Sequence, residues 1–324
     1  MSFSLAEAPL PADKLEVVLN TIRFAARDTN LYGFQRPDGG VLPPVTPGAH
    51  ISLMLPSGVE RQYSLTNYGD DLTEYVVGVK LDPNSRGGSL FMHNQLRVGT
   101  KIAIESPVNN FALVEDDEHV VLFAGGIGIT PIYSMAKRLI ELGRSWELHY
   151  STRSRADAAF LKELEQHKQV NFHFDDENEG KFLNVPGIVS KTPLNAHLYC
   201  CGPKPMLDAF EKASEGRSPD HIHVEYFTPK YEAADEGGFT VVLAHSEKEI
   251  NVPEGKTILQ VVREAGLDVP FSCEEGICGA CETRVVEGIP DHRDSILTES
   301  EREQNATMMI CCSGSKSPKL VLDI

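Results

Sequence analysis

The stretch SCEEGICGAC contains three cysteines whose spacing is typical of metal coordination. Cys273, Cys278 and Cys281 are separated by four and then two residues, and the adjacent pair Cys311 and Cys312 follows in MMICCSG. A C-x4-C-x2-C run with a fourth, distant cysteine is the ligand pattern of plant-type [2Fe–2S] clusters. Because neighbouring side chains on an extended strand point to opposite faces, we expect only one of the adjacent pair to be a ligand.

The residues between the cysteines also suit a cluster. Gly276, Gly279 and Ala280 are small, so backbone N–H groups can approach bridging sulfides. A structural zinc site prefers two short Cys-x2–4-Cys pairs, whereas the second pair here is adjacent. A Rieske centre needs two histidine ligands, and His292 stands alone near the motif. An inert loop with buried cysteines is the remaining alternative.

A glycine turn follows an apolar run in VVLFAGGIGITPIYSM. Gly126 and Gly128 permit a tight turn beside a ligand, Thr130 is expected to cap the next helix, and Pro131 suits its first turn. The N–H groups and the dipole at such a helix start attract an anion, here a pyrophosphate. No Gly-Lys-Ser/Thr follows, which excludes a Walker A loop. By itself, the turn could also be a plain strand–helix connection.

Two other words end predicted strands, where open α/β sheets bind their ligands. One is CCGPKPM, and the other consists of Ser151, Thr152 and Arg153. These three residues stand where the acidic ribose ligand of standard dehydrogenases is expected. Arg153 and Arg155 could receive a 2′-phosphate, so the residues alone leave NADH and NADPH open.

The words RQYSLTN and SRGGS lie in the β-rich N-terminal part of the chain. Arg61 offers a forked donor set for phosphate, Tyr63 a ring face and Ser64 a hydroxyl. Arg86 and the two glycines beside it could hold a phosphate through their N–H groups. Each word by itself is more typical of a solvated strand end or a turn.

Hydrophobic periodicity predicts a multidomain chain with α+β and α/β parts. Residues 1–113 are expected to form a small β-barrel, and 114–229 alternate strands with helices and predict a parallel sheet. A polar linker is expected at 230–238. Residues 239–324 begin with a hairpin-like pair of strands and a short helix.

The composition of the chain argues against two classes of binding partner. The chain has 324 residues, a net charge of −17 and seven cysteines. Such an acidic chain repels nucleic acid and anionic membrane surfaces. The first residues lack a secretory pattern and no apolar run is long enough to span a membrane, so a cytoplasmic location is predicted.

Together these words resemble the phthalate dioxygenase reductase family, including reductases of the vanillate demethylase type. The cysteine segment with its continuation ETRVVEGIPDHRDSILTESE resembles the family's ferredoxin domain, GGIGITP and CGP its NAD(P) module, and RQYS and RGGS its flavin domain. The likeness covers nearly the whole chain in the same order. It implies an FMN-binding β-barrel, an NAD-binding α/β domain with a parallel sheet, and a C-terminal β-grasp [2Fe–2S] ferredoxin domain.

The resemblance also assigns residues. The family word Met-Met-x-Cys places the fourth cluster ligand at Cys311 and leaves Cys312 as a small buried residue. By the same likeness, Ser64 and Cys201 flank the site of hydride transfer. The FMN-binding residues it implies are Arg61, Gln62, Tyr63, Ser64, Val79, Lys80, Arg86, Gly87, Gly88 and Ser89, with Phe227 over the ring face. Those for the nucleotide are Gly126, Ile127, Gly128, Ile129, Thr130, Pro131, Ser151, Thr152, Arg153, Cys201, Gly202 and Pro203.

Three redox sites in one chain predict a converter between two-electron and one-electron chemistry. A nicotinamide gives a hydride, a [2Fe–2S] cluster takes single electrons, and a flavin can do both. The chain is therefore predicted to be an NADH-dependent reductase that serves a terminal oxygenase component, Rieske-type or a demethylase. NADH is preferred on the resemblance. The alternatives are a soluble ferredoxin or a haem monooxygenase as acceptor, or a non-enzymatic redox sensor.

Overall fold

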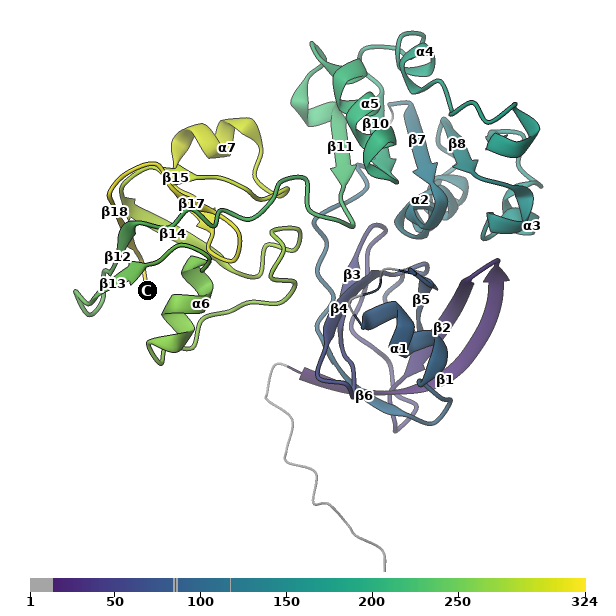
Figure 1. Ribbon diagram of the computed structural model, residues 1–324. Coiled ribbons are helices and arrows are strands. Elements are labelled where there is room, and N and C mark those ends of the chain that lie inside the picture. The colour runs from purple at the N-terminus through teal and green to yellow at the C-terminus, as the bar shows by residue number, and fades with distance from the viewer. Residues whose placement is uncertain (1–13, 84, 86, 117) are drawn as a thin grey trace, which may run out of the picture. The chain divides into compact units, whose positions relative to one another are not determined.

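The computed structural model describes residues 14–83, 85, 87–116 and 118–324. The chain divides into two compact units, the first ending at Glu225 and the second running from Tyr226 to Ile324 (Figure 1). Within the described residues, every helix is too short or too polar to cross a membrane.

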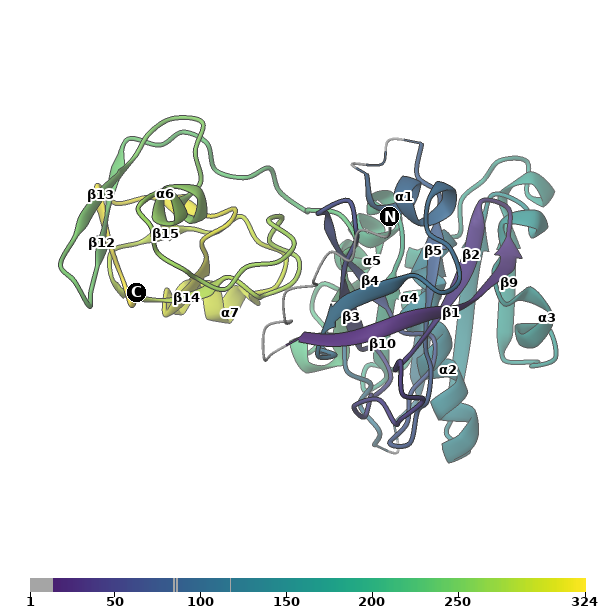
Figure 2. The ribbon, with the colours of Figure 1, turned by 90° about the horizontal axis from the view of Figure 1, so that it is seen from below.

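The N-terminal part of the first unit is an antiparallel barrel. Its six strands lie in the order β4-β3-β6-β1-β2-β5, and a bridge between Leu65 and Val77 links the two edges. Val17 and Leu19 alternate into its core on the long strand β1, which runs along one side of the barrel in Figure 2. The strands are β1 (Lys14–Ala26), β2 (Thr29–Gln35), β3 (His50–Met54), β4 (Glu60–Ser64), β5 (Tyr75–Lys80) and β6 (Lys101–Glu105). The predicted barrel is confirmed, and helix α1 (Gly88–Asn94) begins inside the word SRGGS.

The rest of the first unit is a parallel five-stranded sheet in the order β11-β10-β7-β8-β9. Every residue of β7 and β10 is buried, as expected of central strands covered on both faces. The strands are β7 (Val120–Gly125), β8 (Trp146–Thr152), β9 (Val170–Phe174), β10 (His197–Cys201) and β11 (Ile222–Glu225). The helices are α2 (Ile129–Leu142), α3 (Leu161–Leu164), α4 (Val185–Val189) and α5 (Lys204–Ser214), with single 3-10 turns at η1 (Gly126–Gly128), η2 (Arg155–Asp157), η3 (Asp175–Glu177) and η4 (Pro219–His221).

One helix of this sheet domain is only about one turn long. The segment AAFLKELEQH forms only the four residues of α3, because Phe160 before it has a left-handed backbone with φ of 58°. The side chain of Phe160 stacks on Tyr133 at a ring distance of 3.9 Å, so packing overrides helix propensity there.

The second unit is a mixed five-stranded sheet in the order β13-β12-β18-β14-β16, in which β12 and β18 are parallel. Helix α6 begins at a capping box of Thr257 and Gln260, and it buries Ile258 and Val262. The mixed sheet together with this helix is the predicted β-grasp fold. Its strands are β12 (Phe239–Leu243), β13 (Glu249–Val252), β14 (Glu282–Glu287), β16 (Thr307–Met309) and β18 (Lys319–Leu322), and the smaller elements are β15 (Pro290–Asp291), β17 (Gly314–Ser315), α6 (Ile258–Glu264) and α7 (Glu299–Gln304).

The predicted linker segment contains no helix or strand, yet it is tied to the second unit. Lys230 N–H donates to Ser295 Oγ at 3.1 Å, and Ala234 N–H donates to the carbonyl of Cys312 at 2.8 Å. The segment therefore runs along the cysteine-bearing domain.

Candidate functional site

The four cysteines of the predicted cluster converge in the second unit. Cys273, Cys278 and Cys281 lie in the loop between α6 and β14, and Cys311 follows β16. The sulfur of Cys273 interacts with the thiols of Cys278 and Cys311, and that of Cys281 also interacts with Cys311. The fold thus brings to one place thiols that are up to 38 residues apart in the sequence.

Backbone donors surround these sulfurs. Glu275 N–H donates to Cys273 Sγ at 3.3 Å, and Ala280 N–H donates to Cys278 Sγ at 3.4 Å. The neighbouring thiols, together with such N–H groups, lower the pKa of Cys273. Gly276 and Gly279 have φ of 69° and 81°, which glycine adopts without a Cβ clash. Four convergent thiols with N–H donors fit a [2Fe–2S] cluster.

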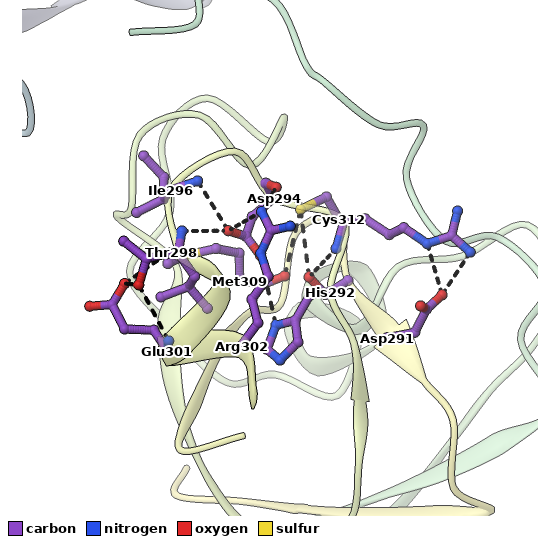
Figure 3. A network of polar contacts seen from close by, with 12 residues as sticks. Asp291, His292, Asp294, Ile296, Thr298, Glu301, Arg302, Met309 and Cys312 are labelled. Carbon is purple, nitrogen blue, oxygen red and sulfur yellow. Dashed lines mark hydrogen bonds and ion pairs between the residues drawn. The ribbon is translucent and has the colours of Figure 1, made fainter. Parts of the chain in front are cut away.

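The segment DHRD, for which the sequence pattern predicts no firm role, supports the cysteine loop. The side chain of Asp294 is fully buried, and its Oδ2 accepts the N–H groups of Ile296 at 3.0 Å and Leu297 at 2.8 Å (Figure 3). Arg302 donates to the Asp294 carbonyl at 2.6 Å, and Ser295 N–H donates to the carbonyl of Gly276 at 2.8 Å. The network therefore joins the cysteine loop to α7.

Cys312 is buried beside the same loop. Its sulfur lies 3.8 Å from the carbonyl of Met309, and a Cβ on Gly276 would come within 2.4 Å of it. The two adjacent cysteines lie in a turn after β16, so the expectation of an extended strand at this point is wrong. The turn forms because Cys312 and Ser313 both donate their N–H groups to Met309.

The two sequence motifs predicted to hold a flavin phosphate, RQYSLTN and SRGGS, contact each other in the barrel. Arg61 on β4 packs so closely on Gly88 that a Cβ there would lie 2.6 Å from Arg61 Cγ. Gly87, with φ of 97°, precedes α1, and Ser89 Oγ accepts the N–H of Asp82 at 3.1 Å. Backbone N–H groups at the start of a helix, next to a guanidinium group, can bind a phosphate.

Most of the other residues predicted to bind the flavin lie at the ends of two barrel strands. Gln62, Tyr63 and Ser64 continue β4, and Val79 and Lys80 end β5. Arg86 lies outside the described residues. Phe227 belongs to the second unit, and its place over the flavin ring stays a prediction.

The glycine turn meets the CGP word at the carboxyl ends of the parallel strands. A Cβ on Gly128 would lie 2.2 Å from the carbonyl oxygen of Cys201, and one on Gly125 would lie 2.4 Å from Pro203 Cδ. Ser151 of β8 pairs with Gly125 in the sheet. The nucleotide residues predicted at 126–131, 151–153 and 201–203 therefore share this edge.

The expected helix cap at Thr130 is wrong. Helix α2 has Gly128 at its N-cap with no side-chain hydrogen bond, and Thr130 Oγ1 donates to the carbonyl of Ile127 at 3.0 Å. The reason is the 3-10 turn η1, which starts the helical geometry at Gly126. Pro131 lies within the first turn, as expected.

Ser64 and Cys201 meet at a carboxyl group that the sequence interpretation missed. Ser64 Oγ lies 3.5 Å from Glu225 Oε2, and Cys201 Sγ lies 3.9 Å from the same oxygen. Burial raises the pKa of Glu225 to about 8, and it also raises the pKa of Cys201 well above its usual value. Glu225 ends a strand of the parallel sheet, and the carboxyl-end rule applied to HIHVE would have found it.

The raised pKa of Glu225 gives a pH-dependent prediction. Between about pH 4.5 and 8 the unfolded chain releases this proton while the native chain keeps it, so the protein loses stability as pH rises. We expect Glu225→Gln to be more stable than the parent at pH 8, by on the order of 2 kcal/mol since the group is partly exposed, and equal to it at pH 4. Urea unfolding at both pH values checks this. A difference independent of pH would contradict it.

Comparisons with known proteins agree with this arrangement. Residues 241–315 match the family described as "2Fe-2S iron-sulfur cluster binding domain", and residues 122–212 match "Oxidoreductase NAD-binding domain". The chain is 48% identical over 307 residues to the phenoxybenzoate dioxygenase subunit beta of Ectopseudomonas oleovorans, covering 94% of this chain and 96% of the relative.

Two solved structures are similar along nearly the whole chain. An intact type IV self-sufficient cytochrome P450 monooxygenase matches 98% of this chain with a TM-score of 0.87 and 36% identity, although this chain spans only 43% of that one. Phthalate dioxygenase reductase, described as a modular structure for electron transfer from pyridine nucleotides to [2Fe–2S], matches with a TM-score of 0.71 and 35% identity, covering 96% of this chain and 98% of that one. The chain therefore belongs to the phthalate dioxygenase reductase family of NAD(P)H-dependent iron–sulfur oxidoreductases, as the sequence predicted.

Proposed function

We propose that this chain is the reductase component of an oxygenase system and passes electrons from NADH, through FMN and a [2Fe–2S] cluster, to a terminal Rieske-type oxygenase or demethylase. The observation that carries the proposal is the convergence of four thiols in the second unit, together with the contact of Arg61 with Gly88 and of the glycine turn with the CGP segment in the first unit. The relatives named for a dioxygenase support the kind of partner.

The proposal includes the division into domains. The barrel at 1–113 takes FMN, the parallel-sheet domain at 114–229 takes NADH, and the segment 230–238 leads to the ferredoxin domain at 239–324. A cytoplasmic location belongs to the same proposal and rests on the sequence. FMN supplies the exchange between a hydride and single electrons when it is bound.

The residues of the chain perform three tasks in this account. Arg61, with Gly87 and Gly88 at the start of α1, binds the flavin phosphate, and the glycine turn at 126–128 binds the nucleotide pyrophosphate. Ser64, Cys201 and Glu225 form a set that carries no charge at neutral pH, because the pKa values of the acid and the thiol are raised. Uncharged side chains can lie against a neutral nicotinamide ring and a flavin without leaving an unpaired buried charge.

The preference for NADH has structural support. Arg155, one of the two arginines that could receive a 2′-phosphate, donates to Glu177 Oε1 at 2.6 Å and lies over the ring of Phe174 at 4.6 Å. A carboxylate beside this guanidinium opposes a phosphate there. Arg153 is the remaining candidate for that role.

One observation supports a second kind of electron acceptor, a haem monooxygenase. The self-sufficient P450 monooxygenase contains a region with this architecture, so a haem monooxygenase is the runner-up partner. Supplying the reduced chain with a Rieske-type oxygenase or with a P450 separates the two, since only the true partner supports coupled substrate oxidation.

Composition and nucleotide preference test the proposal. The purified chain should contain two iron atoms, two acid-labile sulfides and one FMN, and its kcat/KM should be higher with NADH than with NADPH. Acid extraction with chromatography and steady-state ferricyanide reduction measure these quantities. Recovery of FAD, zinc in place of iron, or absence of turnover with NADH would overturn the corresponding part.

A further inference from the structure

A cluster of histidines and carboxylates lies at the amino ends of the parallel strands, at the opposite edge from the nucleotide residues. His197 begins β10 beside Val120 of β7, and Leu198 pairs with Ile222 of β11. This register brings Glu118, just before β7, and His221, just before β11, to either side of His197. The sheet therefore assembles the group from three separate segments.

The spacing of the side-chain atoms suits one metal ion. Glu118 Oε2 lies 3.6 Å from His221 Nε2 and 3.9 Å from His197 Nε2. One atom from each of the three residues lies within 4.8 Å of the others. Tetrahedral zinc with bonds of about 2.1 Å separates its ligand atoms by about 3.4 Å. The two distances from Glu118 Oε2 to the histidine nitrogens need to shorten by only a few tenths of an ångström for one zinc ion to bind all three atoms.

The hydrogen bonding of the group also points to a cation. Glu118 Oε2 is buried and accepts no hydrogen bond from the described residues, and His221 Nδ1 is likewise buried without one. The side chain of His197 is only 5% exposed, and its Nε2 also lies 3.1 Å from Asp116 Oδ2. A carboxylate can only accept hydrogen bonds, and burying its oxygen is costly unless a hydrogen-bond donor or a cation lies against it.

His197 is already oriented as a metal ligand would be. Its Nδ1 lies 3.1 Å from His223 Nε2, and the ring of His223 stacks on Tyr199 at 4.1 Å. A metal at Nε2 would replace the hydrogen that this nitrogen donates to Asp116 Oδ2 at 3.1 Å, and the ring hydrogen would then lie on Nδ1 and be donated to His223. Histidine ligands of metals are commonly held in this way by a hydrogen bond from the other ring nitrogen.

We propose that Glu118, His197 and His221 form a binding site for a divalent transition metal ion of the zinc type. Two imidazoles and one carboxylate are ligands that Zn²⁺ accepts. The cysteines belong to the other unit, and the site is at the far edge of the sheet from the glycine turn. Its role is structural: the ion would join the starts of β7, β10 and β11.

Zinc content measured on the full cofactor-loaded chain tests the proposal. The parent protein, Glu118→Gln and His221→Gln are dialysed to equilibrium against micromolar Zn²⁺, and zinc and iron are determined together. His245→Gln is the matched control, because His245 pairs with Asp323 at 3.0 Å on the exposed surface of the second unit. Unchanged iron shows that zinc has not replaced the cluster.

We expect one zinc per chain in the parent and in His245→Gln, and affinity at least about 10-fold weaker in the two ligand variants. Zinc should raise the thermal midpoint of the first unit in the parent but not in His221→Gln. NADH–ferricyanide activity should be equal in all four proteins and shows that they are folded. Equal zinc binding in the parent and both ligand variants, or none in the parent, would overturn the site and leave a network of hydrogen bonds and ion pairs.

Discussion

Cys311→Ala is expected to abolish the iron content and the cluster spectrum, whereas Cys312→Ala keeps both. Cys311 interacts with Cys273 and Cys281, so we expect its thiol to complete the ligand set. A [2Fe–2S] cluster needs four protein ligands, and loss of one leaves an open iron that solvent can reach. Iron analysis and the visible spectrum of the purified variants measure the effect.

The matched Cys312→Ala variant removes a sulfur that lies against Gly276 and the Met309 carbonyl. It deletes one buried atom, so we expect a stability cost of about 1 kcal/mol without loss of iron. Both variants should keep flavin and NADH–ferricyanide activity, because the first unit is unchanged. Iron lost from the Cys312 variant and retained in the Cys311 variant would reverse the ligand assignment.

Gly128→Ala is expected to destabilise the first unit by about 3 kcal/mol and to abolish productive NADH binding. The added Cβ would lie 2.2 Å from the carbonyl oxygen of Cys201 and 2.8 Å from the N of Gly202, and both are backbone atoms that cannot rotate away. The turn would have to move off the CGP loop, and the proposed nucleotide site would open. Urea unfolding and the KM for NADH report the two effects.

Gly126→Ala is the control for this prediction. Gly126 has φ of 55°, and no heavy atom lies within 4 Å of the position of an added Cβ. Alanine there meets backbone strain of about 1 kcal/mol and no clash. If Gly126→Ala and Gly128→Ala have equal effects, close packing against Cys201 is not the reason for the second glycine.

The parts that could be predicted from sequence are those written in short local patterns. The cysteine spacing predicted a loop in which the thiols do converge, and the alternation of strands and helices after residue 113 predicted the parallel sheet. These patterns are readable because the side-chain period of each element is fixed by its backbone.

The parts that escaped prediction depend on contacts between distant segments. The strand end in HIHVE could have pointed to Glu225, but its contact with Ser64 at 3.5 Å, across 161 residues of sequence, depends on the fold. The role of Asp294 depends on its burial and on Arg302 from α7. The wrong cap at Thr130 followed from η1, a 3-10 turn that the glycine pattern alone does not distinguish from a loop.

Anaerobic rapid mixing with NADH tests the central claim most directly. The claim is that electrons from the nucleotide reach the cysteine-bound cluster within this one chain. With the parent protein, the account predicts that the flavin absorbance bleaches first and that the electron paramagnetic resonance signal of a reduced [2Fe–2S] cluster follows. In Cys311→Ala the flavin should bleach at the same rate and no such signal should appear. A parent protein whose flavin is reduced by NADH while its cluster stays oxidised would contradict the account.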